Sequence, residues 1–388
     1  MKKNMIFLFI VLFCLICFNL KIDIKADDVL TITDSSELTK DAKSACLMEI
    51  KTGKIIYSKN ESERLAPASM TKIMTMILVM EKLEQGTIKL TDMVITPKEA
   101  SSLGGSQIYL SEGEEMSVDD LIKAMAIASA NDATMSLAIY ISGSEEMFVK
   151  AMNDKAKELA LVNTNFVNPY GFDDDNHYSC ASDMAKMAQH LILNYPNILN
   201  YTSIYEDYVR EDTVKKFWLV NTNKLVRFVN EVDGLKTGYT SKSGYCLTAT
   251  INKNNERFIA VAMGNSSSKI RNNEIMNMLN YGVNNYKTEN IIKKGDVIKE
   301  INDIGYSPNK ILLKASKDVT ILKLKNGKTK EIQYKEQIDL NNNNNKLVVY
   351  YDNEQLEVLD LISEEEIKKA NIFELLSEVM KEIFLITE

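Results

Sequence analysis

Histidine is almost absent from this chain, with two residues among 388, and no H-E-x-x-H motif occurs. That motif would place two imidazoles on one helix face for zinc, and a Ser-His-Asp triad also needs a well-placed imidazole. Asp173–Asp175 resembles a calcium loop but lacks the regular oxygen spacing and the closing glutamate. We therefore predict no metal, no cofactor and no histidine-based triad, and we interpret His177 and His190 as structural.

Cysteine is also scarce, at five residues. Two of them lie in the N-terminal apolar run, which leaves Cys46, Cys180 and Cys246. Three widely spaced cysteines do not make a disulfide framework. We interpret them as small buried apolar side chains, with one disulfide and one free thiol as the alternative.

An excess of positive charge is missing as well. The net charge is −8 and the sequence pI is about 5.2, whereas a nucleic-acid-binding protein presents a basic surface. The hydrophobic content of 45% and the charged content of 26% are those of an ordinary globular protein. We therefore expect a globular protein with no nucleic-acid partner.

No hydrophobic run at the N-terminus is long enough to span a bilayer comfortably. Lys2 and Lys3 precede an apolar run over Met5–Phe18, and the small residue Ala26 follows. This pattern is typical of a secretory signal, here residues 1–26. The alternative is an uncleaved anchor. We expect an exported protein that acts outside the cytoplasm.

Residues 27–288 carry mixed helix and strand signals. Apolar runs on both sides of Lys51-Thr52-Gly53 predict a hairpin whose turn uses a positive φ at Gly53. Helical spacing and buried-strand patterns mark the remaining elements. The predicted helices are Pro67–Gly86, Val118–Ser142 and Ala181–Tyr195, and the predicted strands are Gly244–Ile251 and Arg257–Met263.

The pattern changes after Tyr286. Short alternating runs over Ile291–Tyr351 predict a small all-β domain, assigned to residues 289–356. Residues 357–388 are predicted to hold an amphipathic helix. Its apolar positions are Ile372, Leu375, Leu376, Val379, Met380 and Ile383.

Ser69 and Lys72 lie three positions apart at the start of the first predicted helix. Side chains with this spacing share one helix face. A serine hydroxyl needs a neighbouring base to act as a nucleophile, and a partly desolvated lysine can serve. The pattern alone is weak, because Ser266–Lys269 also fits S-x-x-K within polar sequence.

Two further polar groups follow in a consistent order. Ser129 and Asn131 interrupt an otherwise apolar helical stretch, where unpartnered polar side chains are costly. Lys236, Thr237 and Gly238 form the tripeptide KTG on a predicted strand. S-x-x-K, S-x-N and K-T-G in this order are typical of β-lactamases and penicillin-binding proteins.

The combined motifs resemble those of the low-molecular-mass penicillin-binding D-alanyl-D-alanine carboxypeptidases, the serine-type peptidase S11 family. The resemblance is carried by the segments "APASMTKIMT", "ASANDA", "NPYGFDDDNHYSCASDMA", "NTNKL" and "VDGLKTGYTSKSGYCL". It implies an α+β fold with a β-lactamase/transpeptidase-like catalytic domain, in which helices flank an antiparallel sheet. A small all-β domain and a C-terminal amphipathic helix fit the same layout.

The resemblance also implies roles for individual residues. Ser69 matches the acylated nucleophile, Lys72 the group that takes its proton, and Ser129 a proton relay. The remaining positions match substrate-binding residues. These are Asn131, Lys236, Thr237, Gly238, Tyr239 through its backbone N–H, and Arg271.

The implied reaction removes the terminal D-alanine from peptidoglycan stem peptides, and β-lactams are implied as covalent inhibitors of the same serine. Family precedent places the C-terminal helix on the outer face of the cytoplasmic membrane. However, Ser363–Glu388 holds seven glutamates against three lysines, so packing against the β domain or a partner is the rival.

Three alternative functions stay open. A β-lactamase of the same superfamily needs a deacylating carboxylate, and the nearest approach is the out-of-register segment Glu158–Asn163. A non-catalytic cell-wall-binding protein would keep the fold without the chemistry. Endopeptidase action on cross-links would use the same chemistry on another bond.

Overall fold

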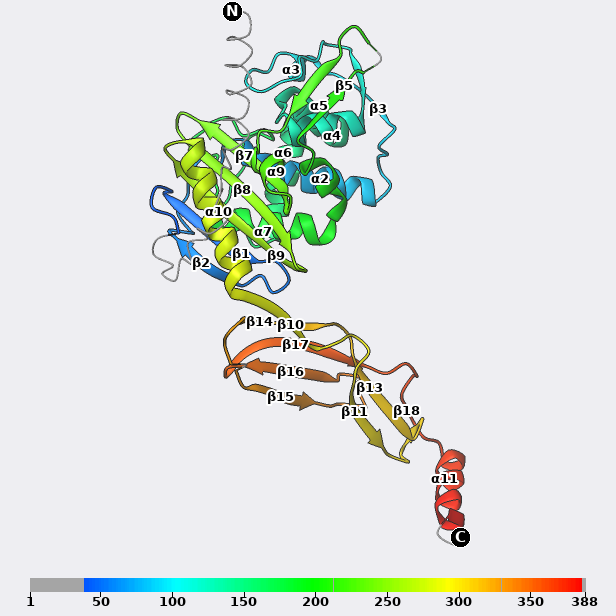
Figure 1. Ribbon diagram of the computed structural model, residues 1–388. Coiled ribbons are helices and arrows are strands. Elements are labelled where there is room, and N and C mark those ends of the chain that lie inside the picture. The colour runs from blue at the N-terminus through cyan, green and yellow to red at the C-terminus, as the bar shows by residue number, and fades with distance from the viewer. Residues whose placement is uncertain (1–37, 212, 329, 386–388) are drawn as a thin grey trace, which may run out of the picture. The chain divides into compact units, whose positions relative to one another are not determined.

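The computed structural model describes residues 38–211, 213–328 and 330–385. Its central sheet has five strands in the order β2-β1-β9-β8-β7, and every neighbouring pair is antiparallel (Figure 1). The strands are β1 (Ser44–Glu49), β2 (Ile55–Lys59), β7 (Val232–Thr240), β8 (Gly244–Lys253) and β9 (Glu256–Asn265). β7 lies at one edge, so it has a strand neighbour on one side only.

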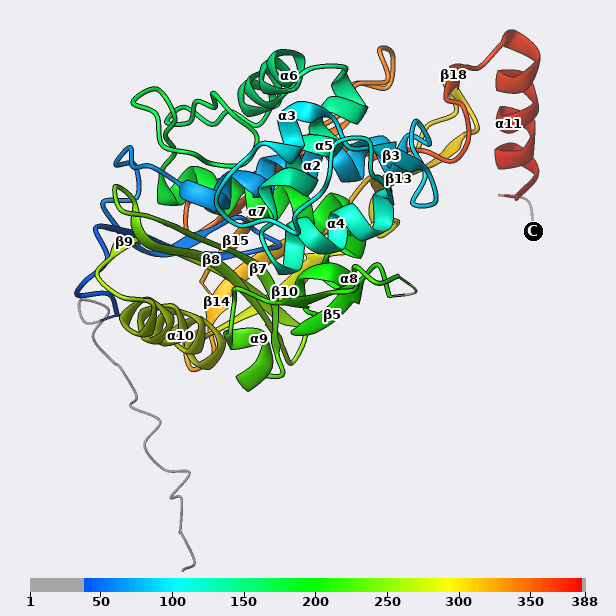
Figure 2. The same cartoon turned by 90° about the horizontal axis from the view of Figure 1, so that it is seen from above.

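Helices cover both faces of this sheet. Helix α10 (Ser268–Asn285) packs on one face and α7 (Ala181–Asn194) on the other, and both contact β1, β8 and β9 (Figures 1 and 2). The sequence of β9 is continuously apolar because helices cover both of its faces. Phe258 packs against Gly282 of α10, while Ile259 belongs to the core on the α7 side. This arrangement confirms the predicted α+β class.

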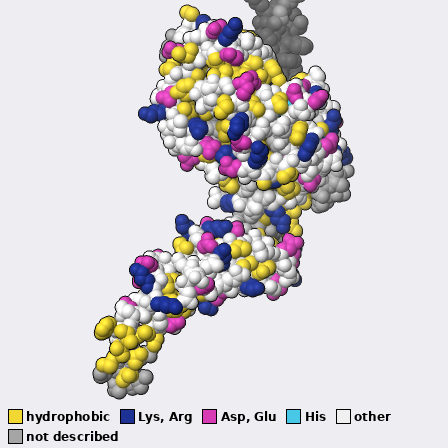
Figure 3. Space-filling model, turned by 180° about the vertical axis from the view of Figure 1, so that it is seen from behind, with side chains coloured by type: hydrophobic (Ala, Val, Ile, Leu, Met, Phe, Trp, Pro, Cys, Tyr) yellow, Lys and Arg dark blue, Asp and Glu magenta, His cyan; other side chains and the backbone are white. Residues whose placement is uncertain are grey.

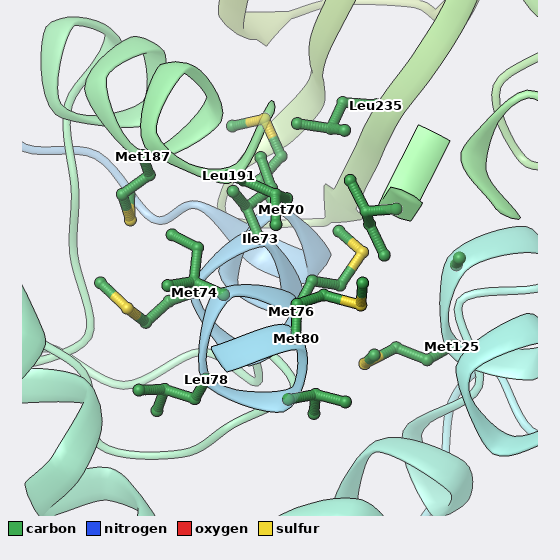
Figure 4. Close-up of a cluster of buried hydrophobic side chains, with 14 of the residues drawn as sticks. Met70, Ile73, Met74, Met76, Leu78, Met80, Met125, Met187, Leu191 and Leu235 are labelled. Atoms are coloured by element: carbon green, nitrogen blue, oxygen red, sulfur yellow. The ribbon is translucent and has the colours of Figure 1, made fainter. Parts of the chain in front are cut away.

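Helix α2 (Lys72–Glu84) runs through the core behind the sheet. All nine residues from Lys72 to Met80 are buried, as expected for a helix that is apolar on every side. Methionine, isoleucine and leucine side chains surround it (Figure 4). The neighbouring helices are α4 (Val118–Ile127), α5 (Asn131–Ser142) and α6 (Glu145–Glu158).

Shorter elements complete this part of the chain. Strands β3 and β4 pair with each other, as do β5 and β6. The short elements are η2 (Ala68–Thr71), β3 (Met93–Ile95), α3 (Lys98–Ser101), β4 (Glu115–Ser117), η3 (Pro196–Ile198), α8 (Leu199–Thr202), β5 (Glu206–Val209), β6 (Phe217–Val220) and α9 (Leu225–Phe228).

The single helix predicted over Val118–Ser142 is wrong. α4 ends at Ile127 and α5 begins at Asn131, and Ser129 between them has φ of 62°. Loop contacts replace the helical hydrogen bonds here: the Asn131 N–H donates to the Ser106 carbonyl, and the Ile127 carbonyl accepts from the Thr222 N–H. The two polar residues therefore mark a break in the helix.

The N-terminal hairpin and the cysteines agree with the sequence. Gly53 has φ of 65° in the turn between β1 and β2. Cys46, Cys180 and Cys246 are all buried and all free, so the disulfide alternative is not realised among these three. The predicted signal at residues 1–26 lies outside the described residues.

The C-terminal part is built of strands with a core of its own. Its sheets have the orders β11-β13-β17-β16-β15, β10-β14 and β12-β18. The strands are β10 (Tyr286–Ile292), β11 (Val297–Asn302), β12 (Tyr306–Ser307), β13 (Lys310–Ala315), β14 (Val319–Leu324), β15 (Ile332–Gln337), β16 (Lys346–Tyr351), β17 (Glu354–Ile362) and β18 (Lys368–Lys369).

Both predicted boundaries of this domain need correction. The one after residue 288 falls inside β10, and the one after residue 356 falls inside β17, whose residues continue the sheet to Ile362. Helix α11 begins only at Ile372 and ends at Leu385. Across the residues that the structure describes, no helix combines the length and the apolar character needed to cross a membrane.

Candidate active site

Ser69 lies in a tight turn that leads into the first long helix. The turn is η2, and Lys72 is the first residue of α2. Lys72 Nζ lies 3.0 Å from Ser69 Oγ, within hydrogen-bond distance. The structure therefore brings together the two side chains that the S-x-x-K pattern singled out.

Lys72 is fully buried and has two further contacts. Its Nζ donates to Asn131 Oδ1 at 2.7 Å and to the Tyr170 carbonyl at 2.8 Å. Burial and the positive charge of Lys236 hold the pKa of Lys72 well below its usual range. A neutral amine has two hydrogens and one lone pair. In that form, with both hydrogens on these acceptors, the lone pair would face the Ser69 hydroxyl.

The second motif lies at the break between α4 and α5. Ser129 is 3% exposed, and Asn131 connects three parts of the site. Its Oδ1 accepts from Lys72, its Nδ2 donates to the Gly104 carbonyl at 2.8 Å, and its N–H donates to the Ser106 carbonyl at 2.7 Å. Asn131 therefore ties the 104–106 segment to the base.

Asp132 strengthens the same attachment. Its carboxylate is fully buried and accepts from the backbone N–H groups of Ile108 and Leu110. Hydrogen bonds to backbone donors offset the cost of burying this charge. Asp132 was not among the predicted site residues, although an acid directly after Asn131 in an apolar stretch was a visible signal.

The third motif lies on β7. Lys236 is 1% exposed, and its Nζ donates to the Thr237 carbonyl at 3.2 Å. Burial and the nearby Arg271 charge lower the pKa of Lys236 to about 7. The Thr237 hydroxyl donates to the Thr222 hydroxyl at 2.7 Å. Thr222 belongs to the "NTNKL" segment, but no role was predicted for it from the sequence.

Gly238 has a structural reason that was not predicted from the sequence. The sequence suggested a close approach of a substrate backbone. In the structure, a Cβ at Gly238 would lie 2.6 Å from the Pro67 carbonyl. Glycine therefore lets β7 pack directly against the turn that carries Ser69. Tyr239 follows with its side chain 56% exposed and its ring against Tyr245.

Arg271 lies on α10 beneath β8. It is 5% exposed and donates to the Cys246 carbonyl at 3.2 Å, and Cys246 is the β8 partner of Gly238. Burial lowers the pKa of Arg271 to about 10, so the side chain stays charged at neutral pH. Arg271 thus adds positive charge close to Lys236, and two neighbouring cations can attract an anionic group.

A loop between α6 and α7 closes the site on the remaining side. Its Tyr170 carbonyl binds Lys72, and Asn168 Oδ1 accepts from the N–H groups of Gly171 and Phe172. Gly171 has φ of 96°, and a Cβ there would lie 1.9 Å from the Ala68 carbonyl. Only glycine fits between this loop and the nucleophile turn.

The competing patterns do not assemble a site. Ser266 and Lys269 are both exposed, and the Ser266 hydroxyl hydrogen-bonds to Asp41. Glu158, the nearest approach to a deacylating carboxylate, pairs with Lys155 and is 61% exposed. In the described structure, neither the Ser266/Lys269 pair nor Glu158 contacts Ser69 or Lys72.

Comparison with known proteins agrees with this geometry. The family model described as D-alanyl-D-alanine carboxypeptidase, peptidase S11, matches residues 31–267. The D-alanyl-D-alanine carboxypeptidase DacF of Bacillus subtilis is 48% identical over 354 residues, which is 89% of this chain and 91% of that protein.

Solved structures show the same fold. Penicillin-binding protein 5 from Haemophilus influenzae superposes with a TM-score of 0.75 and 31% identity, covering 85% of this chain and 98% of that one. Penicillin-binding protein D2 from Listeria monocytogenes, solved in its ampicillin-bound form, has a TM-score of 0.56 and 29% identity. It covers 62% of this chain and 97% of that one.

Proposed function

Because this chain belongs to the D-alanyl-D-alanine carboxypeptidase family, we propose that Ser69 is the nucleophile of its serine-type carboxypeptidase activity and Lys72 the base. The observation that carries this assignment is the environment of Lys72 Nζ. Asn131 and Tyr170 take its two donors, and Ser69 Oγ lies 3.0 Å away. A buried neutral lysine can accept the serine proton as the hydroxyl attacks.

The reaction is an acyl transfer in two steps. Ser69 Oγ attacks the carbonyl carbon between two D-alanines, and its proton passes to Lys72. The resulting oxyanion is held by the backbone N–H groups of Ser69 and Tyr239. The C–N bond then breaks, the proton returns to the leaving amine with Ser129 as relay, and D-alanine departs. Water then hydrolyses the acyl-enzyme ester on Ser69 through the same order of attack and proton transfer.

The substrate is a peptidoglycan stem peptide that ends in D-Ala-D-Ala. Lys236 and Arg271 supply positive charge for its terminal carboxylate, and Thr237 supplies a hydroxyl. Asn131 and the free edge of β7 bind the peptide backbone. This edge at Lys236–Tyr239 can pair with one extended chain.

Two measurements test the assignment together. Incubation with benzylpenicillin should add one penicilloyl group per chain, and peptide mapping should place it on Ser69. Incubation with a peptide ending in D-Ala-D-Ala should release free D-alanine. Rapid steady-state turnover of a chromogenic β-lactam, in place of one stable adduct, would favour the β-lactamase alternative.

The Lys236 environment predicts a pH dependence. Its pKa of about 7 means that the lysine loses its positive charge as pH rises through that value. We expect kcat/KM for a carboxylate-terminated peptide to fall over the same interval, since kcat/KM reports the free enzyme. Lys236→Arg keeps its charge at all these pH values, so the falling limb should disappear. An unchanged limb in Lys236→Arg would contradict the assignment.

We also propose that α11 anchors the protein to the outer face of the membrane. Its Glu374 and Glu378 accept hydrogen bonds from Ser307 and Asn309 of the β domain, so the helix meets that domain through polar groups. The apolar side chains stay exposed and gather along the helix (Figure 3). They are Ile372, Phe373, Leu376, Val379, Met380 and Ile383, each 39–80% exposed.

Vesicle binding tests this anchor. The chain from residue 27 should co-sediment with phosphatidylcholine vesicles, and a variant ending at residue 370 should not. Anionic lipid should weaken binding, because Ser363–Glu388 carries seven glutamates and three lysines. Equal sedimentation of the full and shortened chains would assign the helix to protein contacts.

A further inference from the structure

His177 is a buried histidine that the reaction described above does not use. It is 2% exposed and lies in the loop between α6 and α7. Its two ring nitrogens have different partners. Nδ1 lies 3.1 Å from the Val167 N–H, and Nε2 lies 2.8 Å from the Thr71 hydroxyl. Thr71 is two residues after Ser69, so the ring connects this loop to the nucleophile turn.

These partners determine the tautomer of the ring. The Val167 N–H can only donate, so Nδ1 must accept with its lone pair. Burial lowers the pKa of His177 to about 4, against the opposing effect of Asp174, so the ring is neutral at neutral pH. The single ring proton is therefore on Nε2, which donates to Thr71 Oγ1.

The hydrogen bond continues from Thr71 to the residue before the nucleophile. Thr71 Oγ1 donates to the Ala68 carbonyl at 2.8 Å. Ala68 has φ of 48°, an uncommon conformation for a residue with a Cβ. Its carbonyl also packs against Gly171 on the loop. Thr71 and Gly171 thus hold this peptide unit in a conformation that the chain would not favour alone, and His177 holds Thr71.

The peptide unit that joins Ala68 to Ser69 is planar and carries two polar groups. One is the Ala68 carbonyl, and the other is the Ser69 N–H, which points the opposite way. Fixing the direction of the carbonyl therefore fixes the direction of the N–H. A donor on the carbonyl also polarises the peptide and makes the N–H a better donor.

We propose that His177 is a positioning residue that acts through Thr71 to aim the Ser69 N–H at the oxyanion of the acyl-transfer reaction. This inference rests on the proposed role of Ser69 as nucleophile. It assigns His177 an effect on the rate of acylation, because an oxyanion forms only as the bond to Ser69 develops.

Two substitutions of His177 separate this role from a structural one. The amide nitrogen of glutamine reaches the position of Nε2, so His177→Gln keeps a donor for Thr71 and loses the acceptor for Val167. The amide oxygen of asparagine reaches the position of Nδ1, so His177→Asn keeps the loop contact and loses the donor. If His177 only holds the loop through Val167, His177→Asn should retain more activity than His177→Gln. If His177 positions Thr71, His177→Gln should retain more activity.

The measurement is the acylation rate constant with benzylpenicillin, determined together with the dissociation constant of the non-covalent complex. We expect His177→Asn to lower the rate constant ~10-fold or more, a part of the ~10²–10³-fold loss seen when an oxyanion-hole donor is removed. The dissociation constant should change little. His177→Gln should stay within a few-fold of the wild type on the same scale.

Thr71 provides an independent pair of variants if the histidine variants fold poorly. Thr71→Val removes the hydroxyl and keeps the shape, so it should slow acylation as His177→Asn does. Thr71→Ser keeps the hydroxyl, so its acylation rate constant should be close to that of the wild type. In the double variant His177→Asn/Thr71→Val the two effects should not add, because both remove the same interaction.

His190→Gln is the matched control. The His190 ring contacts Asn194 at the end of α7 and Tyr195 directly after it, and its replacement should leave acylation unchanged. Wild-type acylation rates in both His177→Asn and Thr71→Val, or a greater loss in glutamine than in asparagine, would overturn the proposal. Failure of the wild-type protein to label at Ser69 would instead count against the nucleophile assignment.

Discussion

Replacing Ser69 with alanine is expected to abolish both the release of D-alanine and the formation of a β-lactam adduct. The variant lacks the only hydroxyl that lies within hydrogen-bond distance of Lys72 in the described structure. Removing the nucleophile of a serine protease costs on the order of 10⁶-fold in kcat, and we expect a loss of similar size. Intact-protein mass spectrometry and a D-alanine assay measure the two effects.

Ser266→Ala is the natural control for this experiment. Ser266 and Lys269 have the same S-x-x-K spacing as Ser69 and Lys72, but they are exposed, and Ser266 binds Asp41. The control should keep both activities. A penicilloyl group on Ser69→Ala, or one that maps to Ser266, would show that the nucleophile lies elsewhere.

Substitution of Lys72 is expected to have the second largest effect, a reduction of acylation by ~10²–10⁴-fold, the usual value of general base catalysis. The two informative variants are Lys72→Ala and Lys72→Arg. Arginine keeps hydrogen-bond donors near Asn131 and the Tyr170 carbonyl, but it stays protonated and cannot accept the serine proton. Both variants should therefore be slow.

The pH profile adds a second test of Lys72. The pKa of Lys72 is lowered well below its usual range by burial and by the Lys236 charge. Acylation of the wild type should rise with pH as this lysine loses its proton, and the variants should lack that rising limb. If Lys72→Arg were acylated as fast as the wild type, Lys72 would act as a hydrogen-bond donor and another group would be the base.

The sequence was most informative where chemistry needs particular side chains. Ser69, Lys72 and Asn131 could be grouped from the order of residues alone, because a serine nucleophile needs a base and a buried amide needs partners. The structure brings these three into contact. The alternation and the apolar runs also predicted the strands around Gly244–Ile251 and Arg257–Met263, since strands covered on both faces have few other sequence patterns.

The sequence was least informative where the backbone supplies the contact. The Tyr170 carbonyl binds Lys72, yet every residue has a carbonyl, so no residue type marks that role. The sequence predicted one continuous helix through Ser129, because the contacts that interrupt it there are also made by backbone groups. The cause of the break is a pair of hydrogen bonds that connect Asn131 and Ile127 to distant segments, and such tertiary contacts override local propensity.

The reason for Gly238 shows a third kind of limit. A glycine in a strand indicates that something approaches closely, but it does not identify what approaches. The approaching group is the Pro67 carbonyl, which lies far earlier in the chain. The same ambiguity applies to the β domain boundary, because β17 continues the alternating pattern past residue 356 without a turn signal.

The open edge of β7 cannot by itself determine which peptides the enzyme cuts. Main-chain groups at an open strand edge form hydrogen bonds with the backbone of any extended peptide. These hydrogen bonds therefore do not discriminate between peptides with different side chains. Selection must come from the chain end, where Lys236 and Arg271 are buried beside each other. A peptide that ran on past this point would bring a neutral amide against two unneutralised cations. We therefore expect the site to cleave next to a free terminal carboxylate faster than at interior bonds that have no free acid beside them.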